Sequence, residues 1–197
     1  VLLISLDSVR ADFVGAYALP GGPVLITRGL LKRLENEAQL AGVLAHEISH
    51  VDGKHALKAL RKTNILSAAG EAASSELRQK EILDKAAEWL ISAAEGGFQR
   101  SDEFDADDAG VGLARAAGYD GSGLYWALKR LYEVSSQRGE GDAGAYDCGA
   151  FFRATHPKLD ERLSRLLAGP GRQAKGAVLG KRYRAAVPGR LRAAPAR

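Results

Sequence analysis

The stretch that decides the fold is NEAQLAGVLAHEISHV, residues 36–51. Asn36 is a residue type preferred just before a helix, and Gln39 follows it three positions later, as in a capping box. Beyond this start, apolar residues recur at helical spacing and would form one buried face. They are Leu40, Val43, Leu44, Ile48 and Val51. We therefore expect an amphipathic helix that buries this face.

Weaker signals on both sides of this helix predict a small sheet and several further helices. Residues 1–6 and 23–27 are short apolar stretches typical of strands, with a Pro-Gly turn at residues 20–22 between them. We expect helices at 29–34, 61–97 (broken near residue 70), 101–117, 123–134 and 159–167, and a Gly- and Ser-rich loop at 135–149. The predicted class is α+β, mainly helical with a small sheet.

Composition divides the chain into a body and a basic tail. Hydrophobic residues make up 46% of the chain, enough for a core, yet no apolar run approaches the ~20 residues of a membrane helix. The net charge of +4 comes from residues 171–197, which hold eight basic residues and no acidic one. We expect one domain over residues 1–170 and a basic C-terminal extension over 171–197.

The basic extension is most simply a solvated segment. It could also bind an acidic partner or an anionic membrane. Its single aromatic residue, Tyr183, gives little surface for stacking on bases, so we expect no nucleic-acid partner. The single cysteine, Cys148, excludes an internal disulfide and a cysteine-rich metal site.

The end of the predicted helix at 36–51 has the composition of a metal site. His46 and His50 are four residues apart, so on a helix both imidazoles point toward one spot. Zinc binds neutral imidazoles and carboxylates in tetrahedral geometry, and catalytic sites leave one position open. Glu47 would lie within reach of a water there and could act as general base. The alternative is a purely structural histidine pair.

A third ligand must come from elsewhere in the chain. His55 lies five residues after His50, whereas the metzincin pattern requires six, so we expect it to be a polar residue near the helix end. The acidic segment at 101–108 is the better source. Glu103 and Asp107 share one helix face, and one of them can bind the metal while the other orients a ligand histidine.

Four motifs in this order resemble those of the HtpX-like, CAAX-prenyl-protease-type zinc metallopeptidases, metallopeptidase family forty-eight, and in particular their soluble, BepA-like branch. The motifs lie at residues 16–31, 37–51, 101–120 and 155–162. The second contains His-Glu-x-x-His, the third contains Glu103-x-x-x-Asp107, and the last contains Thr-His156-Pro and Arg162. One departure is Gly15, where family members usually have Asn.

The resemblance implies a zincin-like fold and a specific zinc site. Zn²⁺ would be held by His46, His50 and Glu103, with Glu47 as general base and Asp107 supporting a ligand. His156 and Arg162 would lie near the metal. His156 would stabilise the oxyanion, occlude the site or serve only as a structural histidine.

The resemblance also implies a substrate and a compartment. An edge strand beside the helix, formed by Val24, Leu25, Ile26 and Thr27, would bind an extended peptide by strand addition. The expected activity is endopeptidase action on unfolded or misassembled proteins outside the cytoplasm, in the periplasm or cell envelope. A missing N-terminal anchor or the basic tail would provide membrane association. The alternative function is a metal-containing chaperone or assembly factor.

Overall fold

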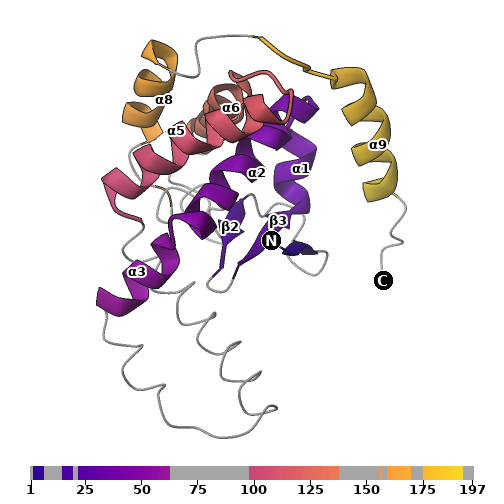
Figure 1. Cartoon of the computed structure of the whole chain (residues 1–197). Helices are drawn as coiled ribbons and strands as arrows, with labels where there is room; N and C mark the ends of the chain where they lie inside the picture. The colour runs from indigo at the N-terminus through magenta and orange to yellow at the C-terminus, as the bar shows by residue number, and fades with distance from the viewer. Residues whose placement is uncertain are drawn as a thin grey trace, which may run out of the picture.

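The computed structural model describes residues 2–6, 15–19, 22–62, 98–137, 156, 159–169 and 175–192. Strands β1 (Leu2–Leu6), β2 (Ala16–Ala18) and β3 (Pro23–Thr27) precede helices α1 (Arg28–Arg33), α2 (Glu37–Asp52) and α3 (His55–Lys62). Helices α5 (Arg100–Ala116), α6 (Gly123–Gln137), α8 (Leu159–Ala168) and α9 (Gly180–Arg192) follow. This arrangement is the predicted mainly helical α+β class with a small sheet (Figure 1).

The three strands form one sheet in the order β1-β3-β2. β1 pairs with β3 in parallel, and β2 pairs with β3 antiparallel, with Ala16 opposite Ile26 and Ala18 opposite Val24. The prediction that residues 24–27 form an edge strand is therefore wrong, because β1 and β2 occupy both sides of β3. The edge strand that packs beside α2 is β2, whose three residues are buried.

Helix α2 begins as its sequence predicts. The Asn36 side chain accepts a hydrogen bond from the Gln39 amide at 2.9 Å. The Gln39 side chain accepts in turn from the Glu35 amide at 2.8 Å, one residue earlier than in a standard capping box. These two bonds fix where α2 starts, and so fix which residues face inward one to four turns later.

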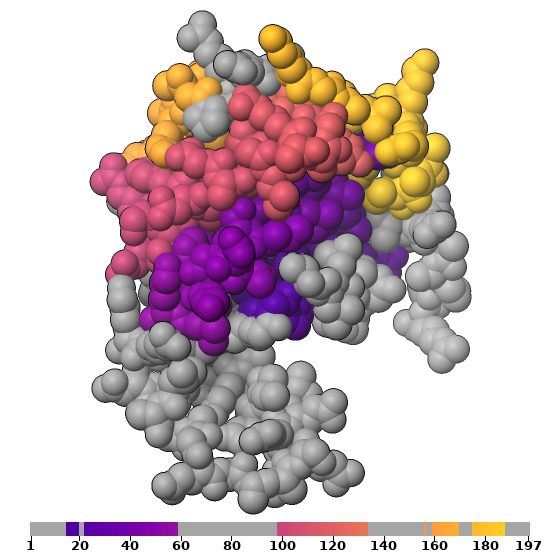
Figure 2. Space-filling model, in the orientation of Figure 1, coloured from indigo at the N-terminus to yellow at the C-terminus, as the bar shows by residue number. Residues whose placement is uncertain are grey.

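Helix α2 occupies the centre of the molecule, with α5 and α6 packed along it and β2 against its other side. In the space-filling view, the atoms of α5 and α6 form a layer over α2 (Figure 2). Glycine permits the close approach to α6, since a Cβ on Gly42 would lie 2.5 Å from the Leu124 amide nitrogen. Leu30, Leu124, Leu128 and Leu166 fill the core around this junction.

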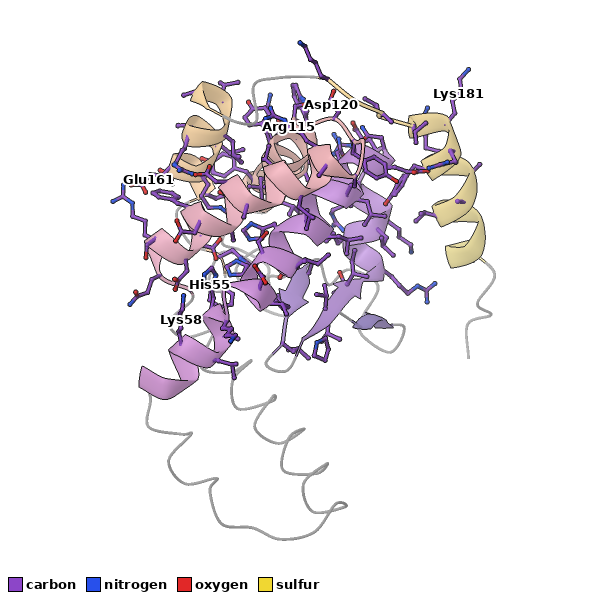
Figure 3. All side chains as sticks on the ribbon, viewed as in Figure 1. His55, Lys58, Arg115, Asp120, Glu161 and Lys181 are labelled. Atoms are coloured by element: carbon purple, nitrogen blue, oxygen red, sulfur yellow. The ribbon has the colours of Figure 1, made fainter. Side chains whose placement is uncertain are left out.

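The last described segment packs on the body. In α9, Tyr183 is only 2% exposed, belongs to the core cluster and donates a hydrogen bond to the Leu31 carbonyl at 2.7 Å. Arg182 forms an ion pair with Glu37 in the first turn of α2, whereas Lys181 points away from the body (Figure 3). A fully solvated extension was therefore the wrong expectation for this face of α9, because its one aromatic side chain is buried.

The other predicted boundaries differ from the structure by a few residues. Gly118 ends α5 with a φ of 86°, the left-handed conformation that glycine adopts freely. α6 continues to Gln137, into the stretch predicted as a loop. The described residues do not include the rest of that loop, in which Cys148 lies. They also do not include residues 63–97 of the helix predicted at 61–97. None of the helices within the described ranges has the length and apolarity needed to cross a bilayer.

Candidate metal centre

Two imidazoles on α2 form the first part of the site. His46 and His50 are 3% and 1% exposed, and their Nε2 atoms lie 3.0 Å apart. The spacing of four residues places both rings on the face of α2 that is covered by α5. Burial lowers the pKa of His50 to about 3, so this ring is neutral and keeps a lone pair for a metal.

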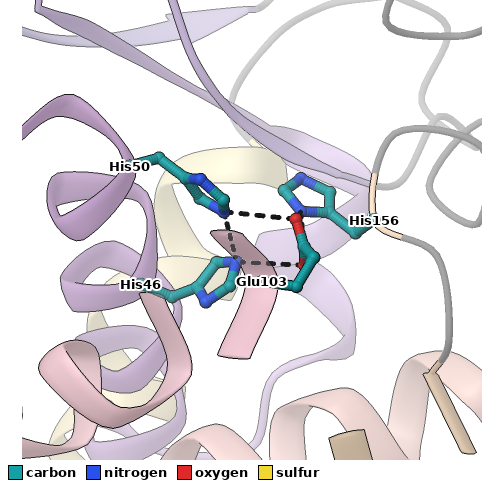
Figure 4. Close-up of side chains that lie close together, drawn as sticks. All are labelled: His46, His50, Glu103 and His156. Atoms are coloured by element: carbon teal, nitrogen blue, oxygen red, sulfur yellow. Dashed lines mark hydrogen bonds and ion pairs between the residues drawn. The ribbon is translucent and has the colours of Figure 1, made fainter. Parts of the chain in front are cut away.

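Glu103 on α5 provides the third group. Its Oε1 lies 3.3 Å from His50 Nε2 and its Oε2 lies 3.7 Å from His46 Nε2 (Figure 4). Burial alone would raise the pKa of this carboxyl, but Arg162 and His156 hold it well below its usual range. Glu103 is therefore an anion inside the protein, opposite the imidazoles of His46 and His50.

The three groups fit a zinc ion. Zinc ligands at about 2.0–2.1 Å in a tetrahedron lie roughly 3.3 Å from one another. The two imidazole nitrogens lie 3.0 Å apart, and each lies 3.3 or 3.7 Å from one of the two Glu103 oxygens, so the separations bracket that edge length. Two nitrogen donors and one carboxylate oxygen also match the donor set of catalytic zinc sites.

Gly110 explains why α5 can bring Glu103 so close to α2. A Cβ at Gly110 would lie 2.9 Å from the His46 amide nitrogen and 3.0 Å from its Cα. Glu103, Asp107 and Gly110 are spaced by four and three residues, so all three lie on one face of α5. Close contact at Gly110 therefore sets the distance between the two helices that carry the donors.

Asp107 supports His46 from the side opposite the metal position. Its Oδ1 lies 3.0 Å from His46 Nδ1, a contact that fits a proton on Nδ1 and a lone pair on Nε2. Burial alone would raise the pKa of Asp107, but Arg162 lowers it to about 2. Asp107 is thus charged and can accept a hydrogen bond from His46 Nδ1, which would fix the tautomer of His46.

Arg162 on α8 joins the two carboxylates of α5. Its Nη1 lies 2.6 Å from Glu103 Oε2, its Nη2 donates to Asp107 Oδ1 at 2.6 Å and its Nε donates to Asp107 Oδ2 at 2.8 Å. Arg162 has no exposed surface. A single guanidinium therefore neutralises and positions both acids, and its Nη2 also lies 3.4 Å from each ring nitrogen of His46.

His156 and Glu47 complete the site. His156 Nδ1 lies 3.1 Å from Glu103 Oε1, and its Nε2 lies 3.7 Å from Glu47 Oε1. Although burial alone would lower the pKa of His156, the Glu103 carboxylate raises it. The donor atoms of His46, His50, Glu103 and His156 all lie within 4.8 Å of one another. The structure thus brings together the predicted ligands, the general base and the residues predicted near them: His46, His50, Glu103, Glu47, Asp107, His156 and Arg162.

Two aromatic rings enclose His50: Phe98, which the sequence did not single out, and His55, which the sequence predicted as a polar residue near the helix end. Phe98 stacks on it with ring centroids 4.1 Å apart and planes at 17°. His55 lies behind it, with the two Nδ1 atoms 2.8 Å apart, and is not part of the four-residue donor group. Burial lowers the pKa of His55. Its sequence position alone carried no sign of this contact, since it depends on how the chain turns after α2.

Comparison with known proteins agrees with this geometry. A family model described as Peptidase family M48 matches residues 5–169. The Beta-barrel assembly-enhancing protease of Yersinia pestis is 27% identical over 164 residues, which cover 79% of this chain and 32% of that protein. The Mitochondrial metalloendopeptidase OMA1 of Arabidopsis thaliana is 27% identical over 160 residues, which cover 81% of this chain and 30% of that protein.

A shorter relative is similar at the same level. The Metalloprotease YcaL of Escherichia coli is 30% identical over 131 residues, which cover 64% of this chain and 50% of that protein. The matched part of the chain therefore covers 30–50% of the length of these three relatives.

Proposed function

Because the chain belongs to peptidase family M48, we propose that His46, His50 and Glu103 hold one zinc ion and that the chain hydrolyses peptide bonds as a metalloendopeptidase. The observation that carries this proposal is the donor triangle formed by His46 Nε2, His50 Nε2 and the buried Glu103 carboxylate. The two nitrogens lie 3.0 Å apart, Glu103 Oε1 lies 3.3 Å from His50 and Glu103 Oε2 lies 3.7 Å from His46. Zinc bound by these residues would supply Lewis-acid polarisation of a water and of the substrate carbonyl.

In this proposal, Glu47 is the general base. It is 1% exposed and adjacent to His46 on α2, and within the described part of the chain its Oε2 makes no hydrogen bond. A free carboxylate oxygen beside the donor triangle can accept the proton of the attacking water. Glu47 can then pass that proton to the leaving amine nitrogen.

Arg162 and His156 have different roles in this proposal. Arg162 is a positioning residue, since its guanidinium contacts carboxylates and is fully buried. His156 is the catalytic candidate, because its raised pKa favours a protonated ring that can donate a hydrogen bond to the carbonyl oxygen as negative charge develops there. If His156 instead occludes the site, replacing it with alanine will raise the rate of cleavage.

The proposed substrates are unfolded or misassembled polypeptides outside the cytoplasm, in the periplasm or cell envelope. Support comes from the similarity to a Beta-barrel assembly-enhancing protease. Strand addition at residues 24–27 is not part of the proposal, because β1 and β2 already pair with β3. We also propose a division of the chain into a peptidase domain, residues 1–170, and a basic segment, residues 171–197. Contact of that basic segment with a membrane is likewise a proposal.

The test combines metal analysis with cleavage of a denatured casein-type substrate. Wild-type protein should hold one zinc per chain and cleave internal bonds. Glu47→Gln should keep the zinc and lose about 10²–10⁴-fold in rate, the usual contribution of a general base. Glu103→Ala should lose the zinc. Glu133→Gln, an exposed carboxylate change on α6, is the matched control.

Two results would count against the proposal. Cleavage by Glu47→Gln at the wild-type rate would remove Glu47 from the reaction. Suppression of substrate aggregation that survives both Glu47→Gln and metal removal, with no cleavage by wild-type protein, would favour the chaperone or assembly factor instead.

A further inference from the structure

His55 contacts His50 on the side away from the metal position. His50 presents Nε2 to His46 and Glu103, and its other ring nitrogen, Nδ1, lies 2.8 Å from His55 Nδ1. The two rings meet edge to face, with centroids 4.9 Å apart and planes at 79°. His55 is 4% exposed, so water does not compete for this contact. Figure 3 shows His55 at the junction of α2 and α3.

The turn between α2 and α3 is shaped to hold this ring. Lys54 has a φ of 53°, a left-handed conformation uncommon for a residue with a side chain. A Cβ on Gly53 would lie 2.4 Å from His55 Nε2, so the ring occupies the space that the glycine leaves. Gly53 itself has a φ of −67° and a ψ of −7°, which any residue can adopt. Glycine is therefore needed here for the histidine ring and not for the backbone.

The chemistry of an imidazole fixes which way the hydrogen bond runs. A histidine that binds a metal through Nε2 carries its proton on Nδ1. His50 Nδ1–H must therefore donate to His55 Nδ1, which must be bare. The proton of His55 then sits on Nε2, on the side of Asp102, whose Oδ1 is 3.8 Å away. That separation is too long for a hydrogen bond. The negative charge of Asp102 nevertheless attracts the Nε2–H edge of the His55 ring, and so favours the proton on Nε2.

We propose that His55 is a positioning residue of the metal centre, which accepts the Nδ1 proton of His50 and so fixes the tautomer and the ring orientation with which His50 meets the metal. It does for His50 what Asp107 does for His46. Phe98, stacked on the open face of His50, keeps the ring in the same plane. This inference rests on the proposed zinc site, and it adds a residue that does not touch the metal.

The first test measures zinc affinity by competition with a chromophoric chelator. His55→Leu removes the acceptor and should weaken zinc binding about 10- to 100-fold, the usual effect of losing such a partner. His55→Asn places an amide oxygen near the position of Nδ1 and should recover most of the affinity. Gly53→Ala keeps the histidine but displaces its ring, and should weaken binding as His55→Leu does. Glu133→Gln, the exposed change on α6, is again the control.

A double-mutant cycle separates this role from general packing. If Gly53 acts only through His55, the variant with both Gly53→Ala and His55→Leu should bind zinc no more weakly than His55→Leu alone. Wild-type affinity in His55→Leu would overturn the proposal, as would equal losses in His55→Leu and His55→Asn. Failure of wild-type protein to bind zinc would instead refute the proposed function.

A second measurement needs no variant and covers the case in which His55→Leu does not fold. In zinc-loaded wild-type protein labelled with ¹⁵N, the hydrogen bond should give a ¹⁵N–¹⁵N coupling between His50 Nδ1 and His55 Nδ1. The His50 Nδ1 proton should exchange slowly with water. A His50 Nδ1 proton that exchanges freely, with no coupling, would overturn the proposal.

Discussion

Replacing Arg162 with methionine should destabilise the metal-free protein strongly, while the same change at Arg165 should not. Both arginines lie on α8, one turn apart. Arg162 contacts Glu103 and Asp107 and has no exposed surface. Arg165 pairs with Asp108, and both side chains are about two-fifths exposed. The pair of variants therefore compares a buried ion cluster with a surface ion pair on the same helix.

The magnitude follows from the burial of the two acids. Arg162→Met leaves Glu103 and Asp107, which are 0% and 1% exposed, without their cation. Removing one partner of a buried ion pair typically costs 3–5 kcal/mol, because the remaining charge is left without compensation. For a chain of this size, that cost corresponds to a fall of roughly 6–20 °C in the melting temperature. Arg165→Met should cost at most about 1 kcal/mol.

The stability lost in Arg162→Met should decrease as the pH falls. The pKa of Asp107 is lowered to about 2 in the folded protein, and that of Glu103 is well below its usual range. Carboxylates with a lowered folded-state pKa stabilise the fold above their unfolded-state pKa of about 4, and this stabilisation is lost as the pH falls through the folded value. The free energy of unfolding of Arg162→Met should therefore differ most from that of wild type at pH 7, and the two values should approach each other below about pH 4.

Urea denaturation with a chelator present, at pH 7 and at pH 3, measures both effects. A loss of under 1 kcal/mol for Arg162→Met at pH 7, with an unchanged m-value, would refute the reasoning that the buried acids depend on this arginine. A difference that stays the same at pH 3 would refute the electrostatic origin of the cost and assign it to packing.

Two further changes test how the donors are held. Asp107→Asn keeps an acceptor for the Nδ1 proton of His46 but removes the charge, and should weaken zinc binding about 10- to 100-fold in a chelator competition; an unchanged affinity would contradict the role given to Asp107. Gly110→Ala should lower stability by about 1–3 kcal/mol in thermal unfolding, since its Cβ would meet the backbone of His46. Gly112→Ala, with open space around the new Cβ, should be neutral or stabilising by up to about 1 kcal/mol; equal effects at the two glycines would contradict close helix contact as the cause.

The sequence predicted the parts of the site that depend on one helix at a time. The cap at Asn36 and the four-residue spacing of His46 and His50 are properties of α2 alone. The pairing of Glu103 with Asp107 is likewise a property of one face of α5. Periodicity reports such faces directly, and the family match confirms the resemblance that joined them into one site.

Features that depend on how separate elements meet could not be predicted in this way. A short apolar stretch indicates a strand but not its neighbours, so the central place of β3 between β1 and β2 was missed. The contact of His55 with His50 depends on a left-handed Lys54, and lysine is not a residue type that indicates such a turn. The burial of Tyr183 depends on a return of the chain to α1 across more than 150 residues of sequence.

That return has a consequence for where the chain can be shortened. The family match ends at residue 169, but the hydrophobic interior does not, because the Tyr183 ring belongs to it and Arg182 reaches the first turn of the helix that carries His46 and His50. A fragment trimmed to the boundary of the match would keep every donor atom and every acid described here. It would nevertheless remove Tyr183 from the core cluster, so we expect a fragment that folds on its own to need α9.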